Sequence, residues 1–402
     1  MKIIHTSDWH IGQDFYNLDR TREHEAFLSQ LKDLVCKESP DALVVSGDIF
    51  DSSQPTIAAQ SLYNRAMIEI AKAAPATRIV VAAGNHDGAS RQEIFAELWD
   101  TALNVKYVGK IGYNPDGTVD YDKFIVEIPG KGFVIAVPYI YTENYPGSPD
   151  PAMIPIQAFH QELLDRVKER NTEGLPVVMM GHLAVANCDT KGHDTAKARL
   201  IFEDLPLLGE GYDYLALGHI HKPQTLTEGN TARYSGSPIP VSFDEDYEHS
   251  VSIVTIGAHG DVPQIETVPV ENVMPIYNLP KKAGDLDEVK AAIAALPAGA
   301  EGYARVNIKV TDILPMETKV EIESLMKAHE GVKLCNINLD RGVSDGPKVL
   351  KAYTPDELKQ SVDPVQIAKD YYEAGHNGEP LPAELVEILS AIVKEVENSE
   401  EE

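Results

Sequence analysis

Five short apolar runs in this sequence lead directly into side chains that can bind a metal ion. In chain order these side chains are Asp8 with His10, Asp48, Asn85, His182, and His219 with His221. A single Gly-Asp or Gly-His after a strand is usually an ordinary turn, so each group alone is weak evidence. Their joint occurrence indicates a metal site, because α/β proteins place their ligands at the carboxyl ends of strands. Glycine precedes the ligands of four of the five groups, which lets the backbone approach the site closely.

The types of these side chains indicate which ions they suit. Carboxylate, imidazole and carboxamide groups without a thiolate favour Mn²⁺, Fe²⁺ or Zn²⁺ over Ca²⁺, which prefers oxygen ligands alone. Seven ligand side chains are too many for one ion, so we expect two ions. Two ions about 3.5–4 Å apart suit the hydrolysis of phosphate esters and need a bridging carboxylate. Asp48 is the expected bridge, because its run lies between the Asp8 and His10 pair and Asn85.

The segment YLALGHIH, residues 214–221, is ambiguous when it is read alone. In an extended chain His219 and His221 project to the same side, because successive side chains alternate between faces. Two such histidines are more often ordinary core residues than ligands. The four other groups favour the metal-binding interpretation.

The elements that must position these ligands follow the pattern of an α/β protein. The expected strands span residues 2–6, 42–46, 78–83, 133–137, 176–180 and 214–217. Expected helices span residues 21–37, with Phe27, Leu31, Leu34 and Val35 on one face, and 55–74, with Pro55 in the first turn.

The pattern changes near residue 272. A separate alternation of strands and helices occupies residues 274–341, and two further helical patterns lie within 363–396. We therefore expect three parts, residues 1–272, 273–345 and 346–402. The last pair of helices is too small to bury its apolar stripe alone, so it docks either on its own chain or on a partner protein.

The composition limits the class of protein. A hydrophobic content of 43% over 402 residues predicts a globular protein. Cys36, Cys188 and Cys335 lie far apart, so neither a disulfide framework nor a thiolate zinc site is expected. The start MKIIHTSD lacks the pattern of a signal peptide and no apolar run is long enough to cross a bilayer, so we expect a soluble, cytoplasmic protein. A net charge of −28 argues against nucleic-acid binding.

The motifs together resemble a known family. The blocks D-x-H, G-D-x-x-D, G-N-H-D, G-H and G-H-x-H occur in the order found in the calcineurin-like metallophosphoesterase superfamily. Within it, SDWHIGQ, SGDIFDSSQP, AGNHD, ALGHIHKPQ and YSGSPIPVSF resemble the SbcD family of bacterial nuclease subunits. The resemblance implies a four-layer α/β metallophosphoesterase β-sandwich flanked by helices, with a small α/β capping domain and a C-terminal helix-loop-helix.

The resemblance also implies roles for individual residues. It assigns Asp8, His10, Asp48 and His221 to one ion, and Asp48, Asn85, His182 and His219 to the other. His86 would orient the scissile phosphate or protonate the leaving oxygen, and Asp51 would hold His86 in orientation. The implied cofactors are two divalent ions, Mn²⁺ first, with Mg²⁺, Fe²⁺ and Zn²⁺ as alternatives.

The function implied by the resemblance is metal-dependent cleavage of DNA, as a double-strand exonuclease and a single-strand or hairpin endonuclease. The protein would be the SbcD-like subunit of an ATP-dependent complex in DNA repair, recombination and replication. Residues 1–272 would be the nuclease domain, 273–345 the cap, and the helices within 346–402 the docking element for an SbcC-type ATPase. Residues 55–74 and 90–103 would pair two copies into a homodimer, although these helices could instead only cover the sheet.

The negative charge is compatible with DNA binding, because the relevant field is local and a two-metal centre is itself positive. Candidate phosphate contacts are Lys191, Lys197, Arg199 and Lys222, which ordinary surface cations would also explain. Two other functions fit the motifs. One is a phosphodiesterase that acts on small phosphoesters or nucleotides, and the other is an inactive scaffold of the same fold. The intact ligands and His86 argue against the scaffold.

Overall fold

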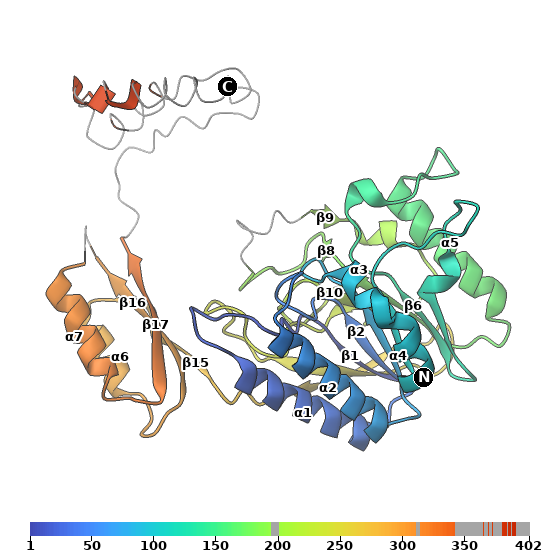
Figure 1. Ribbon diagram of the computed structural model, residues 1–402, viewed down its shortest axis with the longest axis horizontal. Helices are drawn as coiled ribbons and strands as arrows, with labels where there is room; N and C mark the ends of the chain where they lie inside the picture. Colours follow the sequence, from blue (N-terminus) through green and yellow to red (C-terminus); the bar gives the residue numbers. More distant parts are fainter. Residues whose placement is uncertain are drawn as a thin grey trace. The chain divides into compact units, whose positions relative to one another are not determined.

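The structure is a computed structural model that describes residues 1–193, 201–310 and 314–341, and positions 365, 369, 372, 380–383, 385, 386 and 388–390 (Figure 1). Its contacts group Met1–Ile308 with Leu314–Leu339 in one compact unit, and residues 309–313 and 340–402 in another. Most of the expected helix-loop-helix lies outside the described residues. Among the helices that are described, none has both the length and the apolar character of a membrane span.

Two six-stranded sheets form the centre of the first unit. One sheet contains, from edge to edge, β14 (Gln264–Pro269), β13 (Ser250–Thr255), β1 (Lys2–Thr6), β2 (Ala42–Ser46), β3 (Arg78–Ala82) and β4 (Val105–Val108). The other contains β11 (Gln224–Thr225), β12 (Ala232–Tyr234), β10 (Tyr214–Gly218), β7 (Val177–His182), β6 (Gly132–Ala136) and β5 (Ile125–Ile128). The strands β1 to β4 run parallel, as do β6, β7, β10 and β12. The carboxyl ends of neighbouring strands therefore meet at one edge of each sheet.

The continuous apolar runs of the sequence follow from burial of these strands on both faces. Along β2, Val44 joins the core between the two sheets, while Leu43 and Val45 join the core beneath the helices. The hydroxyl of Ser46 donates to the carbonyl of Ala216 in β10 at 2.9 Å, which joins the ends of the two sheets. This link brings the loops that carry the ligands to one place.

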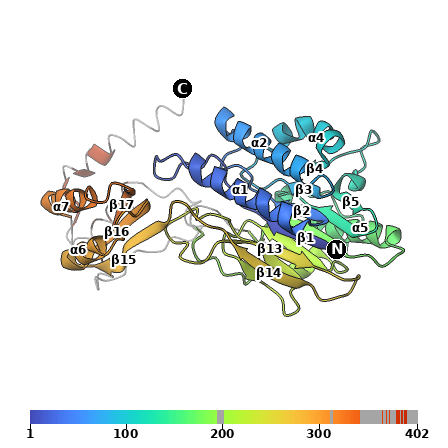
Figure 2. The same ribbon diagram turned by 90° about the horizontal axis from the view of Figure 1, so that it is seen from below.

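Helices complete the outer layers. Helices α1 (Thr21–Glu38), α2 (Ile57–Ala73) and α4 (Ala96–Leu103) lie on the same side of the first sheet (Figure 2). Buried Phe27 and Leu31 of α1 and Met67 of α2 share one core with the strands beneath them. Helix α5 (Pro155–Arg170) packs buried apolar residues against the second sheet. This order of helix, sheet, sheet and helix is the expected α/β architecture.

Four details differ from the sequence expectations. Pro55 lies outside α2, because Thr56 is its N-cap and accepts a hydrogen bond from the Ala59 N–H at 3.2 Å. The expected helix at 90–103 is broken into α3 (Ala89–Gln92), a short turn and α4. The strand β10 ends at Gly218, so His219 and His221 follow the strand and do not share its face. A two-stranded ribbon, β8 (Ala184–Val185) with β9 (Phe202–Glu203), was not anticipated.

A third sheet follows β14 in the chain. It contains β15 (Ile276–Gly284), β16 (Gly302–Lys309) and β17 (Val332–Asp340), with helices α6 (Leu286–Ala294) and α7 (Met316–Met326) between the strands. A small apolar cluster of Phe15, Phe243, Met274 and Tyr303 connects it to loops of the preceding part, and the Tyr303 hydroxyl donates to Glu23 at 2.8 Å. Because the same compact unit contains these elements, apart from Lys309 and Asp340 at the ends of β16 and β17, the division at residue 272 stays a prediction.

Candidate metal centre

The loops that follow β1 and β2 hold each other in place through their backbones. The Asp8 N–H donates to the Gly47 carbonyl at 3.0 Å, and the His10 N–H donates to the Asp48 carbonyl at 3.1 Å. These bonds extend the pairing of the parallel strands beyond their ends. The ligand side chains therefore stand on a rigid edge, as precise positioning of a metal site requires.

The backbone at this edge adopts conformations that side chains usually avoid. Asp8, His10, Asp48 and His219 have φ angles of 55°, 46°, 51° and 97°. Each such residue costs about 1–3 kcal/mol, and such strain is concentrated at functional sites. A Cβ on Gly84 would lie 2.1 Å from Oδ1 of Asp48, which explains the glycine before Asn85. The packing of the loops therefore stabilises a local geometry that the residues alone would not favour.

The first group of ligands contains Asp8, His10 and His221, whose ligand atoms lie within 4.8 Å of one another. All three side chains are buried. The Nδ1 atom of His221 lies 3.0 Å from Oε1 of buried Glu245, so its Nε2 atom remains for a ligand. This is the usual arrangement around a metal-binding imidazole, in which a carboxylate fixes the tautomer and the ring orientation.

The second group contains Asp48, His182 and His219, with the same spacing. The Nδ1 atom of His182 hydrogen bonds to the Ser46 carbonyl at 2.8 Å. Its Nε2 atom faces Oδ2 of Asp48 at 3.3 Å and Oδ1 of Asn85 at 3.1 Å. Asn85 thus joins this group, and one nitrogen of His182 is left to point into the centre.

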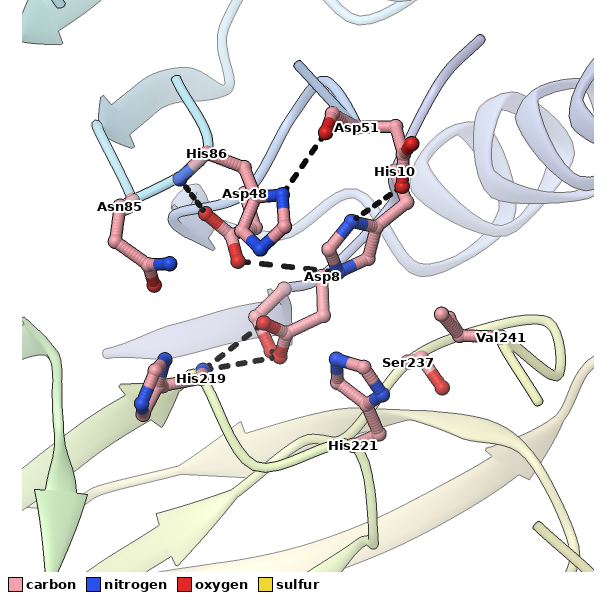
Figure 3. Close-up of polar contacts among 12 residues, drawn as sticks. Asp8, His10, Asp48, Asp51, Asn85, His86, His219, His221, Ser237 and Val241 are labelled. Carbon is pink, nitrogen blue, oxygen red and sulfur yellow. Dashed lines mark hydrogen bonds and ion pairs between the residues drawn. The ribbon is translucent and has the colours of Figure 1, made fainter. Parts of the chain in front are cut away.

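Two carboxylates connect the groups (Figure 3). Oδ2 of Asp48 also lies 3.8 Å from Nε2 of His10, so Asp48 faces a ligand of each group. Asp8 accepts hydrogen bonds from the His219 backbone N–H at 2.9 and 3.2 Å, although His219 belongs to the other group. The structure therefore brings all seven ligand candidates together around these two carboxylates.

The contact between His86 and Asp51 is made by the main chain of Asp51 and not by its carboxylate. Nδ1 of His86 hydrogen bonds to the backbone carbonyl of Asp51 at 2.9 Å, whereas the Asp51 carboxylate lies 3.3 Å from Nδ1 of His10 (Figure 3). The His86 backbone N–H donates to Oδ1 of Asp48 at 2.9 Å. The main chain of Asp51 therefore orients His86, and its carboxylate supports His10, because the turn after Asp48 directs the carboxylate toward the first group.

The electrostatics of the centre favour bound cations. Burial by itself would lower the pKa of His10, but the carboxylates of Asp51, Asp48 and Asp8 raise it to about 9. Burial likewise opposes ionisation of Asp48, yet the adjacent imidazoles, His182 foremost, hold its pKa well below the usual value. Within the described part of the chain, both ring nitrogens of His10 are buried and form no well-aligned hydrogen bond, although Nδ1 lies 3.3 Å from the Asp51 carboxylate. Carboxylates and imidazoles together in one buried place form a donor set that fits divalent ions.

Sequence reasoning missed the residues that support the ligands. Glu245 holds His221, and the Ser7 hydroxyl donates to Oδ2 of Asp8 at 2.5 Å. Asp87, the last residue of the G-N-H-D block, accepts from the backbone N–H groups of Gly84 and Phe50 at 2.8 and 3.0 Å, which fixes the loop around Asn85. Ser7 and Asp87 lie within the motifs SDWHIGQ and G-N-H-D, where no role was assigned to them, whereas Glu245 lies in a loop without a motif.

The candidate phosphate contacts are only partly described. Lys191 pairs with Asp246 at 2.5 Å, and Lys222 pairs with Asp189, so neighbouring carboxylates neutralise both cations. Lys197 and Arg199 lie outside the described residues.

Comparisons with known proteins find similar sequences along most of this chain. Residues 1–223 match the family model described as calcineurin-like phosphoesterase. A protein from Rhodobacter capsulatus, named as the SbcD subunit of the nuclease SbcCD, is 31% identical over 388 residues, which cover 89% of this chain and 93% of that protein. Proteins of the same name from Escherichia coli and Bacillus subtilis are each 30% identical, over 73% and 82% of this chain and 73% and 84% of their own length. This chain therefore belongs to the calcineurin-like phosphoesterases and, within them, to the family of SbcD subunits.

Proposed function

We propose that this protein is a metal-dependent nuclease that hydrolyses phosphodiester bonds of DNA, as the SbcD-type partner of an SbcC-type ATPase. The observation that carries the proposal is the pair of buried ligand groups around Asp48, in a chain related over most of its length to proteins named as SbcD subunits of the nuclease SbcCD. Exonuclease action on double strands and endonuclease action on single strands or hairpins are the expected activities.

The ligand side chains form two sets, and each set would hold one ion. Asp8, His10 and His221 would hold one ion, Asn85, His182 and His219 the other, and Asp48 would contact both. When bound, two divalent ions act as Lewis acids on the phosphate and lower the pKa of water. Mn²⁺ is the first ion to test, with Mg²⁺, Fe²⁺ and Zn²⁺ as alternatives.

His86 is the proposed catalytic residue. If the neutral ring donates its Nδ1–H to the Asp51 carbonyl, its Nε2 atom is left as an acceptor. A proton taken up there can be given to the leaving oxygen, and the same N–H can orient the scissile phosphate. The main-chain contact keeps this tautomer in place while DNA enters and leaves. Asp51 contributes as a positioning residue through its carbonyl and, at His10, through its carboxylate.

Two assembly contacts belong to the proposal. Ile57, Ile94, Phe95 and Leu98 expose 83%, 68%, 58% and 62% of their surface around α2 and α4, which supports pairing of two copies through this face. The helices within residues 346–402 are the proposed docking element for the ATPase. The parts 1–272 and 273–345 would be the nuclease domain and its cap.

The decisive experiment is copurification with the ATPase, followed by cleavage assays on linear duplex DNA with and without ATP and Mn²⁺. The proposal expects Mn²⁺-dependent cleavage that a chelator abolishes. The matched control is His86→Asn, which should retain the metal ions and lose hydrolysis. Rapid turnover of a generic aryl phosphodiester without cleavage of DNA would contradict the proposal and favour a small-phosphoester enzyme.

A further inference from the structure

The loop of residues 189–193, which ends beside the candidate metal centre, is anchored by several hydrogen bonds. The Asp189 N–H donates to Oε1 of Gln224 at 2.7 Å, and Nε2 of Gln224 donates back to the Asp189 carbonyl at 2.8 Å. The Ser242 hydroxyl donates to the Gly192 carbonyl at 3.0 Å. Because these bonds anchor the loop at two points, the position of the following residue, His193, is fixed by the protein.

The His193 ring faces the candidate ligands. Its centroid lies 4.9 Å from that of His221 and 5.6 Å from that of His219, so it contacts one ligand of each group. Both of its ring nitrogens are buried and have no hydrogen-bond partner among the residues that the structure describes. Buried polar atoms in proteins are nearly always paired, so an unpaired imidazole at this place needs an explanation.

The spacing argues against a role for His193 as a metal ligand. Among the described residues, three groups have ligand atoms within 4.8 Å of one another, and His193 is in none of them. It therefore stands beside the ligands, where a bound substrate would lie. A neutral imidazole always keeps one N–H donor, whichever tautomer it adopts. The natural acceptor next to a cation-binding centre that cleaves phosphodiesters is a phosphate oxygen.

We propose that His193 is a substrate-binding residue that donates a hydrogen bond to a phosphate oxygen of the DNA at the metal centre. This inference rests on the proposed nuclease function. The loop that carries His193 is anchored through Asp189, Gln224 and Ser242, so the donor is held in place before the substrate arrives. Preorganisation of this kind strengthens binding, because little conformational freedom is lost.

The test compares variants that separate the shape of the ring from its hydrogen bond. His193→Phe keeps an aromatic ring without a donor, and His193→Gln keeps an N–H donor without the ring. Both are made in the His86→Asn background, so that DNA is bound without being cleaved. Fluorescence anisotropy with a labelled duplex oligonucleotide and Mn²⁺ measures binding, and elemental analysis measures the number of bound ions.

We expect His193→Phe to bind DNA about tenfold more weakly and His193→Gln to stay within about threefold of the background, with an unchanged ion content in all proteins. If His193→Phe does not fold, His193→Ala must show the same loss. Equal DNA affinity of the donor-free variant would overturn the inference, and so would a loss of bound Mn²⁺, which would make His193 a ligand. Failure of the unsubstituted protein to cleave DNA would instead refute the proposed function.

Discussion

Replacement of Glu245 by glutamine tests whether a buried carboxylate holds the metal centre together. Glu245 is 5% exposed, and no spacing in the sequence indicated it. Oε1 lies 3.0 Å from Nδ1 of His221, while Oε2 accepts from the Val241 N–H at 3.0 Å and from the Ser237 hydroxyl at 3.2 Å. Burial opposes ionisation of Glu245, but His221 outweighs this effect and lowers its pKa, so the native group is a carboxylate.

The expected loss of stability in Glu245→Gln follows from the number of hydrogen-bond acceptors in the side chain. Both carboxylate oxygens face an N–H donor, and an amide has only one oxygen. If the amide turns its NH₂ group toward the Val241 N–H, one buried donor is unpaired, which destabilises the protein by about 1–3 kcal/mol. If the NH₂ group faces Nδ1 of His221 instead, the ring must accept there and carry its proton on Nε2, the atom that would bind the ion. Loss of a carboxylate behind a metal-binding histidine also weakens metal affinity by about 10- to 100-fold.

The assay combines urea unfolding of the metal-free protein with calorimetric titration of Mn²⁺. The matched control is Asp244→Asn, an adjacent carboxylate whose side chain is 65% exposed and pairs with Arg305 at 2.6 Å. Because the Asp244 carboxylate is mostly exposed and asparagine keeps an oxygen that can accept from Arg305, this variant should stay within about 1 kcal/mol of the unsubstituted protein and bind Mn²⁺ normally. The reasoning is refuted if Glu245→Gln matches the control in both stability and Mn²⁺ affinity.

Three further predictions concern catalysis, pH and assembly. His86→Asn should abolish phosphodiester hydrolysis while elemental analysis finds the same metal content, and residual activity near the unsubstituted level would remove His86 from the mechanism. In the metal-free protein the pKa of His10 and His182 is raised from 6.5 to about 9. The protonated imidazoles therefore contribute fully to the stability of the metal-free protein below pH 6.5, and this contribution is lost as the pH rises toward 9. The affinity for Mn²⁺ should rise over the same pH range, because the ligands must be deprotonated to bind the ion. An Mn²⁺ affinity that does not change with pH in this range would contradict the prediction. Leu98→Glu should convert the proposed dimer to monomers in analytical ultracentrifugation without changing metal content. A dimer of unchanged mass would exclude this face from the contact.

The strands that lead to the candidate centre, and the types of side chain that follow them, could be predicted from the amino-acid sequence. The strands at 2–6 and 42–46 have the expected bounds, because burial on both faces demands unbroken apolar runs. The ligand types were also readable, since a carboxylate or an imidazole after a strand is a local feature. These local signals were sufficient to predict an α/β fold with ligands at the carboxyl ends of its strands.

The contacts that support and connect the ligand side chains could be identified only from the folded structure. The contact between Asp8 and the His219 N–H joins positions far apart in the sequence, and Glu245 reaches His221 from a loop without a motif. The left-handed backbone at Asp8 and Asp48, and the use of the Asp51 carbonyl to hold His86, are equally invisible in the sequence. These features depend on how the loops of the two sheets pack against one another. Contacts between segments that are distant in the sequence determine this packing, so a local sequence pattern cannot predict it.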